Sequence, residues 1–227
     1  KMFLEAPRKQ LQEVYVSESF LEKCSCREHL EEVGYEVVSD SVFSKISDTC
    51  TPQGVLCVLK QFHYNIEEML RDKAPLFLLL ENIQDPGNLG TMLRTGEGAG
   101  VSGIIMSRDT VDLYNPKVIR STMGSIYRVP FYYADDFAAA VHQVQQAGVS
   151  VYAAHLRGKN SYACQDYTKG TAFLIGNEGN GLREETAELA DCYIRIPMEG
   201  KVESLNAAVA SSILMYEAHR QRATIEK

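Results

Sequence analysis

The sequence contains no Cys-x-x-Cys pair and no apolar run near the roughly 18 residues that a membrane-spanning helix needs. Its five histidines do not cluster near its six cysteines, which are Cys24, Cys26, Cys50, Cys57, Cys164 and Cys192. These absences argue against a membrane protein, a zinc site and a disulfide framework. We therefore expect a cytoplasmic protein with reduced cysteines, no bound metal and no membrane partner.

The first residues also lack the long apolar segment of a secretory leader, since they read Lys1-Met2-Phe3-Leu4-Glu5-Ala6-Pro7-Arg8. Because the first residue is not Met and no strand or cap signal precedes the opening helical stretch, we expect a further segment upstream. The 227 residues, of which 45% are hydrophobic, are enough for one or two globular domains with a real core.

The chain has no excess of positive charge, because its net charge is −7. Lys and Arg drive nucleic-acid binding by neutralising phosphates, so this balance alone disfavours an RNA partner. Between Tyr114 and Tyr133, however, the chain carries Lys117, Arg120 and Arg128 and no acidic residue. Spacing alone leaves two interpretations open, a local basic patch or ordinary scattered surface charge.

The hydrophobic pattern divides the chain into three parts: a small α/β domain at 1–63, a partly helical linker at 64–74 and a larger domain at 75–227. In the first domain we expect strands at 12–16, 35–38 and 54–59 and helices at 20–33 and 41–46. The third strand is the most apolar of these and is therefore expected at the centre of its sheet.

The larger domain alternates strands with helices, which predicts an α/β fold with a parallel sheet and helices on both faces. Residues 76–80 are continuously apolar, as is typical of a strand buried on both sides. Further strands are expected at 103–106, 150–154, 171–175 and 193–196, and helices at 88–97, 117–121, 136–146, 183–190 and 205–222.

One glycine-rich stretch, Gly96-Glu97-Gly98-Ala99-Gly100, superficially resembles a dinucleotide-binding loop. Such a loop follows a strand and opens a helix, whereas these glycines end a helix and precede a strand. We interpret them as a helix cap and a tight turn. This interpretation removes most of the support for an enzyme with a doubly wound nucleotide-binding fold.

Three polar loops each follow an expected strand and lead into an expected helix. The first contains the turn Asp85-Pro86-Gly87, then Asn88 as a candidate N-cap and Arg94 inside the helix. Both residues also have ordinary structural explanations: Asn88 could serve only as a helix cap, and Arg94 could be a solvent-exposed charge on the helix. The apolar neighbours of Arg94 predict a largely buried helix and weaken the second explanation.

The second loop is Gly176-Asn177-Glu178-Gly179-Asn180-Gly181, and the third runs from Pro197-Met198-Glu199-Gly200 to Ser204-Leu205-Asn206. Three glycines let the second loop approach a ligand closely and expose its N–H groups. An ordinary strand-to-helix connection is the alternative for the second loop. Helix capping by Ser204 is the alternative for the third.

Together, the order and content of the three loops resemble the motifs of the SpoU (TrmH-type) family of RNA 2'-O-ribose methyltransferases, in the SPOUT class. The resemblance covers about residues 75–222, and the segment 115–125 is similar to the family segment between the first two motifs. Residues 1–63 resemble, more loosely, a ribosomal-protein-like RNA-binding domain.

The resemblance implies a C-terminal trefoil knot, S-adenosyl-L-methionine as cofactor, an RNA substrate and a homodimer with the last helix and the first-motif helix near its interface. It implies catalytic roles at Asn88, Arg94, Glu178, Ser204 and Asn206. The cofactor positions would be Ala154, His155, Gly176, Asn177, Glu178, Gly179, Ile196, Pro197, Met198, Ser204, Leu205 and Asn206. Phosphates would be held by Arg94, Lys117, Arg120 and Arg128.

The leading hypothesis is methyl transfer to a ribose 2'-hydroxyl of ribosomal RNA, because the N-terminal module is typical of members that act on rRNA. A tRNA 2'-O-methyltransferase is the alternative within the family. A non-catalytic RNA-binding or ribosome-assembly factor is the alternative from another class, and the intact motifs disfavour it. A small-molecule methyltransferase on a doubly wound fold is a further alternative, and the position of the glycine-rich stretch argues against it.

Overall fold

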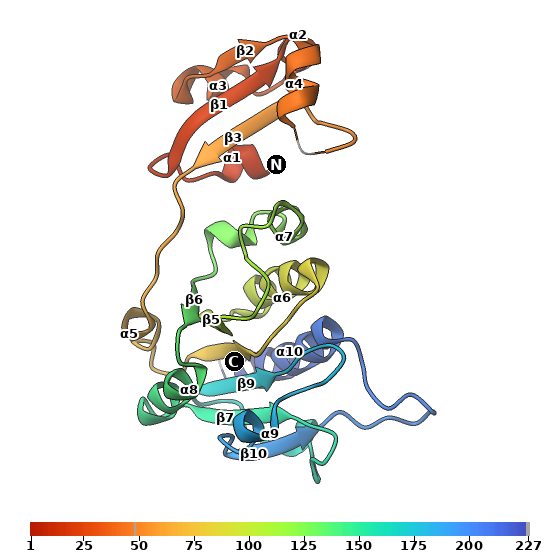
Figure 1. Ribbon diagram of the computed structural model, residues 1–227. Coiled ribbons are helices and arrows are strands. Elements are labelled where there is room, and N and C mark those ends of the chain that lie inside the picture. Colours follow the sequence, from red (N-terminus) through yellow and green to blue (C-terminus); the bar gives the residue numbers. More distant parts are fainter. Residues whose placement is uncertain (48, 226–227) are drawn as a thin grey trace. The chain divides into compact units, whose positions relative to one another are not determined.

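The computed structural model describes residues 1–47 and 49–225, and its internal contacts divide the chain into two compact units, Lys1–Phe62 and His63–Lys227 (Figure 1). Each unit has its own sheet and its own buried core. The boundary falls where the third strand of the small sheet has ended, before the helix α5 (Ile66–Met69) begins.

The first unit is a three-stranded sheet with order β2-β1-β3, in which β1 pairs parallel with β2 and antiparallel with β3. Val14 and Val16 of β1 are buried together with Leu30 and form the centre of its core. Its elements are α1 (Met2–Glu5), β1 (Leu11–Ser17), α2 (Glu18–Lys23), α3 (Arg27–Val33), β2 (Glu36–Val38), α4 (Asp40–Ile46) and β3 (Val55–Leu59).

Two expectations for this unit are wrong. The apolar strand β3 lies at an edge, because β1 pairs with both other strands. The single helix expected over 20–33 is two helices, because Cys24 is extended (φ −71°, ψ 137°) and ends α2. The break allows Phe20 of α2 and Leu30 of α3 both to reach the core, which a helical pattern read along the sequence does not reveal.

The second unit contains a seven-stranded sheet with order β6-β5-β4-β9-β7-β10-β8, and every recorded pairing within it is parallel. The predicted parallel sheet is therefore confirmed. Its strands are β4 (Leu76–Leu80), β5 (Gly103–Ser107), β6 (Phe131–Ala134), β7 (Ser150–Ala154), β8 (Asn160–Ser161), β9 (Thr171–Ile175) and β10 (Cys192–Arg195). The edge strands β6 and β8 were not expected, since four and two residues are too short to show a periodic pattern.

The helices of this unit begin and end close to the expected positions, with one clear exception. The helix expected over 183–190 is the short α9 (Glu184–Ala187). The others are α5, α6 (Pro86–Ala99), α7 (Pro116–Thr122), α8 (Phe137–Gln146) and α10 (Ala207–Ile225), with the 3-10 turns η1 (Ser125–Tyr127) and η2 (Tyr162–Cys164).

One face of the large sheet packs against α5, α8 and α9. Alternate residues of β4, Phe77 and Leu79, share a buried core with Val141 and Val144 of α8. Ile66 and Met69 of α5 belong to the same core, so the stretch expected as a linker is packed against the sheet of the second unit.

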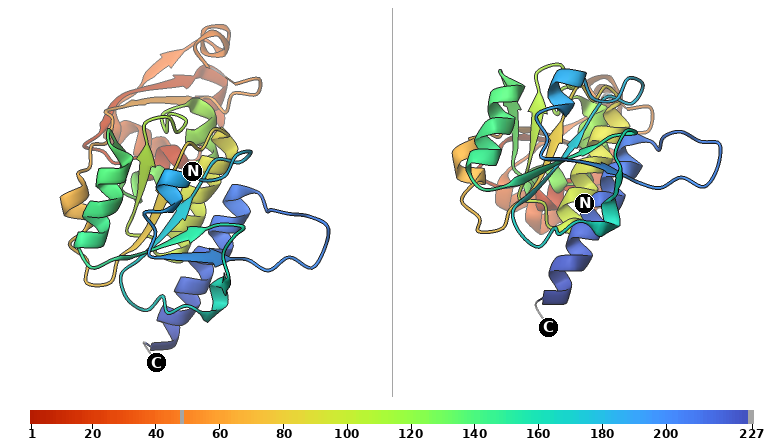
Figure 2. Two further views of the ribbon diagram at one scale, coloured as in Figure 1. Left: turned by 60° about the horizontal axis from the view of Figure 1, so that its bottom comes forward. Right: turned by 90° about the horizontal axis from the view of Figure 1, so that it is seen from below.

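Helices α6, α7 and α10 form the other layer, and the two further views show α6 and α10 side by side (Figure 2). Gly90 permits the close approach of α6 to α7, because a Cβ there would lie 2.3 Å from the Cβ of Ser121. Helix α6 ends at Ala99, and Gly100 caps it in the left-handed conformation (φ +77°). The interpretation of this glycine-rich stretch as a helix cap is confirmed; the knot stays a prediction.

Candidate functional site

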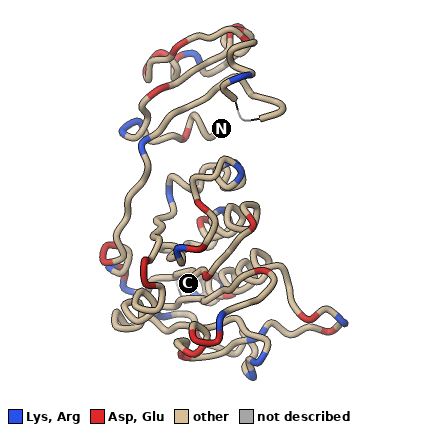
Figure 3. Tube along the Cα trace, viewed as in Figure 1, with Lys and Arg blue, Asp and Glu red and all other residues tan. Residues whose placement is uncertain are grey.

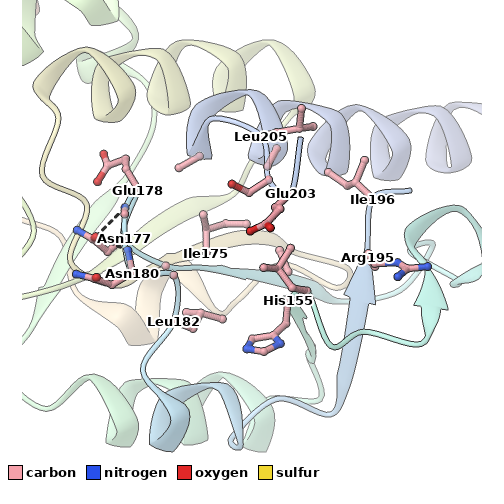
Figure 4. Close-up of a pocket in the computed structure, with 18 of the residues that line it drawn as sticks. His155, Ile175, Asn177, Glu178, Asn180, Leu182, Arg195, Ile196, Glu203 and Leu205 are labelled. Carbon is pink, nitrogen blue, oxygen red and sulfur yellow. Dashed lines mark hydrogen bonds between the residues drawn. The ribbon is translucent and has the colours of Figure 1, made fainter. Parts of the chain in front are cut away.

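A cavity of about 270 Å³ lies where three adjacent parallel strands end, and Figure 4 shows the side chains around it. His155 follows β7, the loop 176–182 follows β9, and the segment 196–205 follows β10. Ligands of open parallel sheets bind at this edge, outside the carboxyl ends of the strands. Its walls combine apolar side chains such as Ile175 and Leu205 with backbone groups of the glycine loop.

The loop that follows β9 is held in one shape by its own hydrogen bonds. Asn177 and Gly181 exchange both backbone hydrogen bonds, at 3.0 and 2.9 Å. The side-chain oxygen of Asn177 also accepts from the backbone N–H of Gly179 and of Asn180, at 2.9 and 3.0 Å. Gly176 must be glycine for this fold-back, because a Cβ there would lie 2.2 Å from the backbone of Gly181. The loop is therefore preorganised.

The same loop is joined to the first-motif loop by Glu178 and Asn177. One carboxylate oxygen of Glu178 accepts from the backbone N–H of Asp85 at 3.1 Å and from the Asn88 amide at 2.9 Å. The other oxygen accepts from the backbone N–H of Gln84 at 3.1 Å. The Asn177 amide donates to the carbonyl of residue 82 at 2.8 Å. Residues about ninety positions apart thus form one surface.

These contacts set the ionisation of Glu178. Burial raises the pKa of its carboxyl, but the hydrogen bonds from Asn88, Gln84 and Asp85 outweigh burial and lower the pKa below its ordinary value. Glu178 is therefore a carboxylate at neutral pH, with its oxygens already committed to three donors. A group in this condition positions its neighbours and is a poor acceptor for a further proton.

The third motif joins the same network through Asn206. Its amide donates to the side-chain oxygen of Asn88 at 2.9 Å, and its own side-chain oxygen accepts from the N–H groups of Ala208 and Val209. Asn206, Asn88 and Glu178 all line a second, more open depression beside the first cavity. Three residues expected to act together are therefore brought together here.

The two capping explanations, which competed with a functional role for Asn88 and Ser204, are wrong. The N-cap of α6 is Asp85, whose side chain accepts from the N–H of Asn88 at 2.8 Å. The residue that caps α10 is Asn206, where Ser204 was the alternative interpretation. In both cases the shift by a few residues frees the Asn88 amide and Ser204 from capping.

A buried carboxylate, which the sequence analysis missed, stabilises the loops at this edge of the sheet. Glu81, only 1% exposed, directly follows β4 and accepts from the Arg183 N–H at 2.8 Å and from the hydroxyl of Thr186. The Arg183 guanidinium lies 3.6 Å from the Glu81 carboxylate and also pairs with Asp109. An acidic residue directly after a wholly apolar strand was the available signal.

His155 lines the cavity, and the centre of its ring lies 5.1 Å from the centre of the Tyr193 ring. Burial, and then the nearby charge of Arg157, lower the pKa of the imidazole, while Glu184 acts in the opposite direction. Its Nδ1 accepts the backbone N–H of Arg157 at 3.1 Å. His155 is thus a neutral wall of the cavity at pH 7.

The expected phosphate-binding residues have different surroundings. Arg94, Lys117 and Arg120 are exposed, and none of them makes a side-chain hydrogen bond or an ion pair within residues 1–47 and 49–225. Arg94 lines neither the cavity nor the open depression and is exposed, although its neighbours Met92 and Leu93 on α6 are buried as expected. Arg128 forms a salt bridge with Glu97 of α6, so an acid distant in sequence offsets part of the expected basic patch.

Ten of the twelve expected cofactor positions line the first cavity, which leaves Pro197 and Asn206 outside its wall. They are Ala154, His155, Gly176, Asn177, Glu178, Gly179, Ile196, Met198, Ser204 and Leu205. Across the part of the chain that the structure describes, there is no cluster of three or more metal-ligating side chains. None of the helices described is long and apolar enough to span a membrane.

Residues 75–216 match the model of the SpoU rRNA Methylase family. The chain belongs to this family. The expectation drawn from the three loops is thereby confirmed, and the matched range begins one residue before β4 and extends into α10.

Individual relatives show how far the likeness extends. Over 180 residues, 79% of this chain and 70% of the relative, the chain is 35% identical to the 23S rRNA (guanosine(2553)-2'-O)-methyltransferase RlmP of Bacillus subtilis. The crystal structure of the AdoMet-bound rRNA methyltransferase from Sinorhizobium meliloti shares 32% identity with a TM-score of 0.79, covering 93% of this chain and 80% of that one. The A. aeolicus TrmH/SpoU tRNA modifying enzyme shares 30% identity with a TM-score of 0.62, covering 70% and 81%.

Proposed function

We propose that this SpoU family member transfers a methyl group from S-adenosylmethionine to a ribose 2'-hydroxyl of ribosomal RNA. The observation that carries the proposal is the hydrogen-bonded chain from Asn206 through Asn88 to Glu178, which joins all three motifs beside the cavity. Family membership and the activities named for its relatives support the same reaction.

The cavity suits the proposed cofactor. The glycine loop brings backbone N–H and C=O groups to its wall, and a Cβ at Gly176 would fill that space. Apolar side chains including Ile175, Leu182 and Leu205 provide surfaces for a flat ring. The crystal structure of the Sinorhizobium meliloti relative is described as AdoMet-bound, which supports this assignment.

The chain's own residues would act mainly by positioning. Bound S-adenosylmethionine supplies an electrophilic methyl group. Holding a weak hydroxyl nucleophile in line with such a group accounts for about 7–11 kcal/mol of a barrier. Asn88 and Asn206, fixed by each other and by Glu178, would orient the ribose in the open depression that they line.

Arg94 would bind the target phosphate or ribose and stabilise the developing alkoxide. A guanidinium has a pKa above about 12, so its use as a free base is costly. Its exposure and its lack of a partner within the described residues leave all of its donors available to RNA. If Arg94→Lys kept a near-full rate, the forked geometry would be irrelevant and this role would be wrong.

RNA binding would be shared between the two units. Lys117 and Arg120, which are exposed on α7, would hold phosphates near the reaction. Figure 3 shows blue segments along α7. Residues 1–62 contain ten acidic and seven basic residues, so this unit would recognise RNA by shape and 2'-hydroxyls more than by charge.

The choice of rRNA over tRNA rests on the extent of the likeness. The rRNA methyltransferase structure from Sinorhizobium meliloti covers 93% of this chain, which includes most of the first unit. The tRNA modifying enzyme from A. aeolicus covers 70%. An N-terminal unit shared with an rRNA enzyme favours an rRNA substrate, in a cytoplasmic setting that the six free cysteines support.

We also propose that the enzyme is a homodimer. Val209 and Tyr216, two helical turns apart on α10, are 48% and 49% exposed. The Tyr216 hydroxyl lies 3.0 Å from the position of a Cβ at Gly98, so α6 and α10 present one continuous surface there. Sedimentation analysis of the wild type and of Val209→Glu tests this, and a monomeric wild type would exclude it.

The decisive experiment is transfer of labelled methyl from S-adenosylmethionine to total rRNA and total tRNA, with Arg94→Ala as control. Label in rRNA that makes one linkage resistant to alkali, and that disappears with the variant, would support the proposal. Label in tRNA alone would favour the other substrate. No cofactor binding at all would favour the non-catalytic RNA-binding alternative.

A further inference from the structure

The wall of the first cavity carries four residues with ionisable side chains: His155, Glu178, Arg195 and Glu203. His155 accepts a backbone N–H, and its lowered pKa keeps it neutral. Glu178 is bound to the first-motif loop by three hydrogen bonds. Glu203 and Arg195, in contrast, make no side-chain hydrogen bond and no ion pair with any residue that the structure describes.

Glu203 is an exposed carboxylate at the wall of the cavity, without an ion pair among the described residues. Two other acids near this edge of the sheet are paired within the chain, Glu184 with Arg157 and Asp109 with Arg183. Figure 4 shows Glu203 over the cavity, near Leu205 and Ile175. A carboxylate at a cavity wall, without a partner among the described residues, attracts a cation in the space that it faces.

We propose that Glu203 binds the positive charge of the cofactor. This inference rests on the proposed function, since it requires S-adenosylmethionine in the cavity. That molecule carries a sulfonium and an ammonium group against one carboxylate, whereas the product S-adenosylhomocysteine has a neutral sulfur. Arg195, the other free charge of the wall, has the wrong sign for either cation. Glu203 is therefore the cavity carboxylate available to attract them.

The chain offers a matched control for this role. Glu199 lies four residues before Glu203 on the same segment, is exposed and does not line the cavity. Glu203→Gln and Glu199→Gln remove the same charge from the same segment, so an effect of overall charge would appear in both. Because both side chains are exposed, neither change is expected to disturb folding, which thermal unfolding would verify.

The test is isothermal titration of the full chain with S-adenosylmethionine and with S-adenosylhomocysteine at low and high salt. We expect Glu203→Gln to weaken binding of S-adenosylmethionine roughly fivefold or more at low salt, and Glu199→Gln to stay within about twofold. A loss confined to S-adenosylmethionine would assign the contact to the sulfonium. An equal loss for both ligands would assign it to the ammonium.

Unchanged affinity of Glu203→Gln for S-adenosylmethionine, with a binding wild type, would overturn the inference and leave the proposed function intact. Equal weakening by both variants would also overturn it, because the effect would then be one of general charge. A wild type that does not bind S-adenosylmethionine would instead refute the proposed function, on which the inference depends.

Discussion

The Asn206 amide donates to the side-chain oxygen of Asn88 at 2.9 Å, across 118 positions of the chain. The Asn88 amide in turn donates a hydrogen bond to a carboxylate oxygen of Glu178. Each amide has only one orientation that satisfies both neighbours, because the Asn206 oxygen caps α10 and the Glu178 oxygens accept only. One hydrogen bond therefore joins the third motif to the first, and a second joins the first motif to the second.

Loss of the Asn206–Asn88 hydrogen bond should reduce methyl transfer more than it reduces the stability of the fold. Asn206→Ala removes the bond to Asn88 and the cap of α10, with an expected loss of about 1 kcal/mol in stability. We expect the rate of methyl transfer to fall by more than tenfold, since Asn88 loses its orientation. Asn206→Asp keeps the cap but cannot donate to Asn88. An Asp variant with wild-type activity in single-turnover assays would exclude this role.

Arg94 should be essential for activity and dispensable for folding. Its side chain is exposed and has no partner among the described residues, so Arg94→Ala should change the unfolding free energy by no more than about 0.5 kcal/mol. We expect the methyl-transfer rate to fall about a hundredfold, as when a transition-state donor is removed. Arg71→Ala, at another exposed arginine of the same unit, is the matched control. Equal effects of the two changes would contradict the assignment.

The exposed cations of α7 should contribute more to RNA affinity than Arg128. Lys117→Ala combined with Arg120→Ala should weaken binding and reduce the slope of log affinity against log salt by about two. Arg128→Ala should reduce that slope by less, because Glu97 already neutralises this guanidinium. Filter binding of rRNA fragments from 50 to 300 mM salt measures both slopes. A larger change for Arg128→Ala would mean that its salt bridge opens on RNA.

Acid should selectively remove the contribution of Glu178 to stability. The hydrogen bonds to Glu178 lower its folded pKa, so its contribution is fully present above the unfolded pKa of about 4.3 and is lost as pH falls through the folded value. The stability difference between wild type and Glu178→Gln should therefore be constant above about pH 5 and shrink below it. Urea unfolding from pH 7 to pH 3 measures this difference, and a difference that grew with acid would show the opposite shift.

The glycine loop offers a matched pair of substitutions. A Cβ at Gly176 would lie 2.2 Å from the backbone of Gly181, whereas a Cβ at Gly179 would meet its nearest atom, the Asn177 side-chain oxygen, at 3.6 Å. Gly176→Ala should therefore destabilise the protein by about 1–3 kcal/mol and abolish cofactor binding. Gly179→Ala should fold normally. Thermal unfolding and titration calorimetry compare the two, and a stable, binding Gly176→Ala variant would refute the loop geometry.

The sequence by itself determined the family, the parallel sheet and the three loops that form the site. These features are local, because each motif is a run of fewer than fifteen residues and each buried strand is an apolar run. The cap at Gly100 was also predictable, since a glycine after an apolar helical pattern has few other uses.

Only the tertiary structure decided which polar groups are paired. Glu97 neutralises Arg128 from 31 positions away, and Glu81 holds Arg183 from 102 positions away. It also decided that β1 is the central strand of the small sheet, because three apolar strands leave their order open. A hydrophobic period records which side of an element is buried, but it contains no information about the distant partner. The partners were therefore settled by the packing of the sheet, which brings the ends of β4, β7, β9 and β10 to one edge.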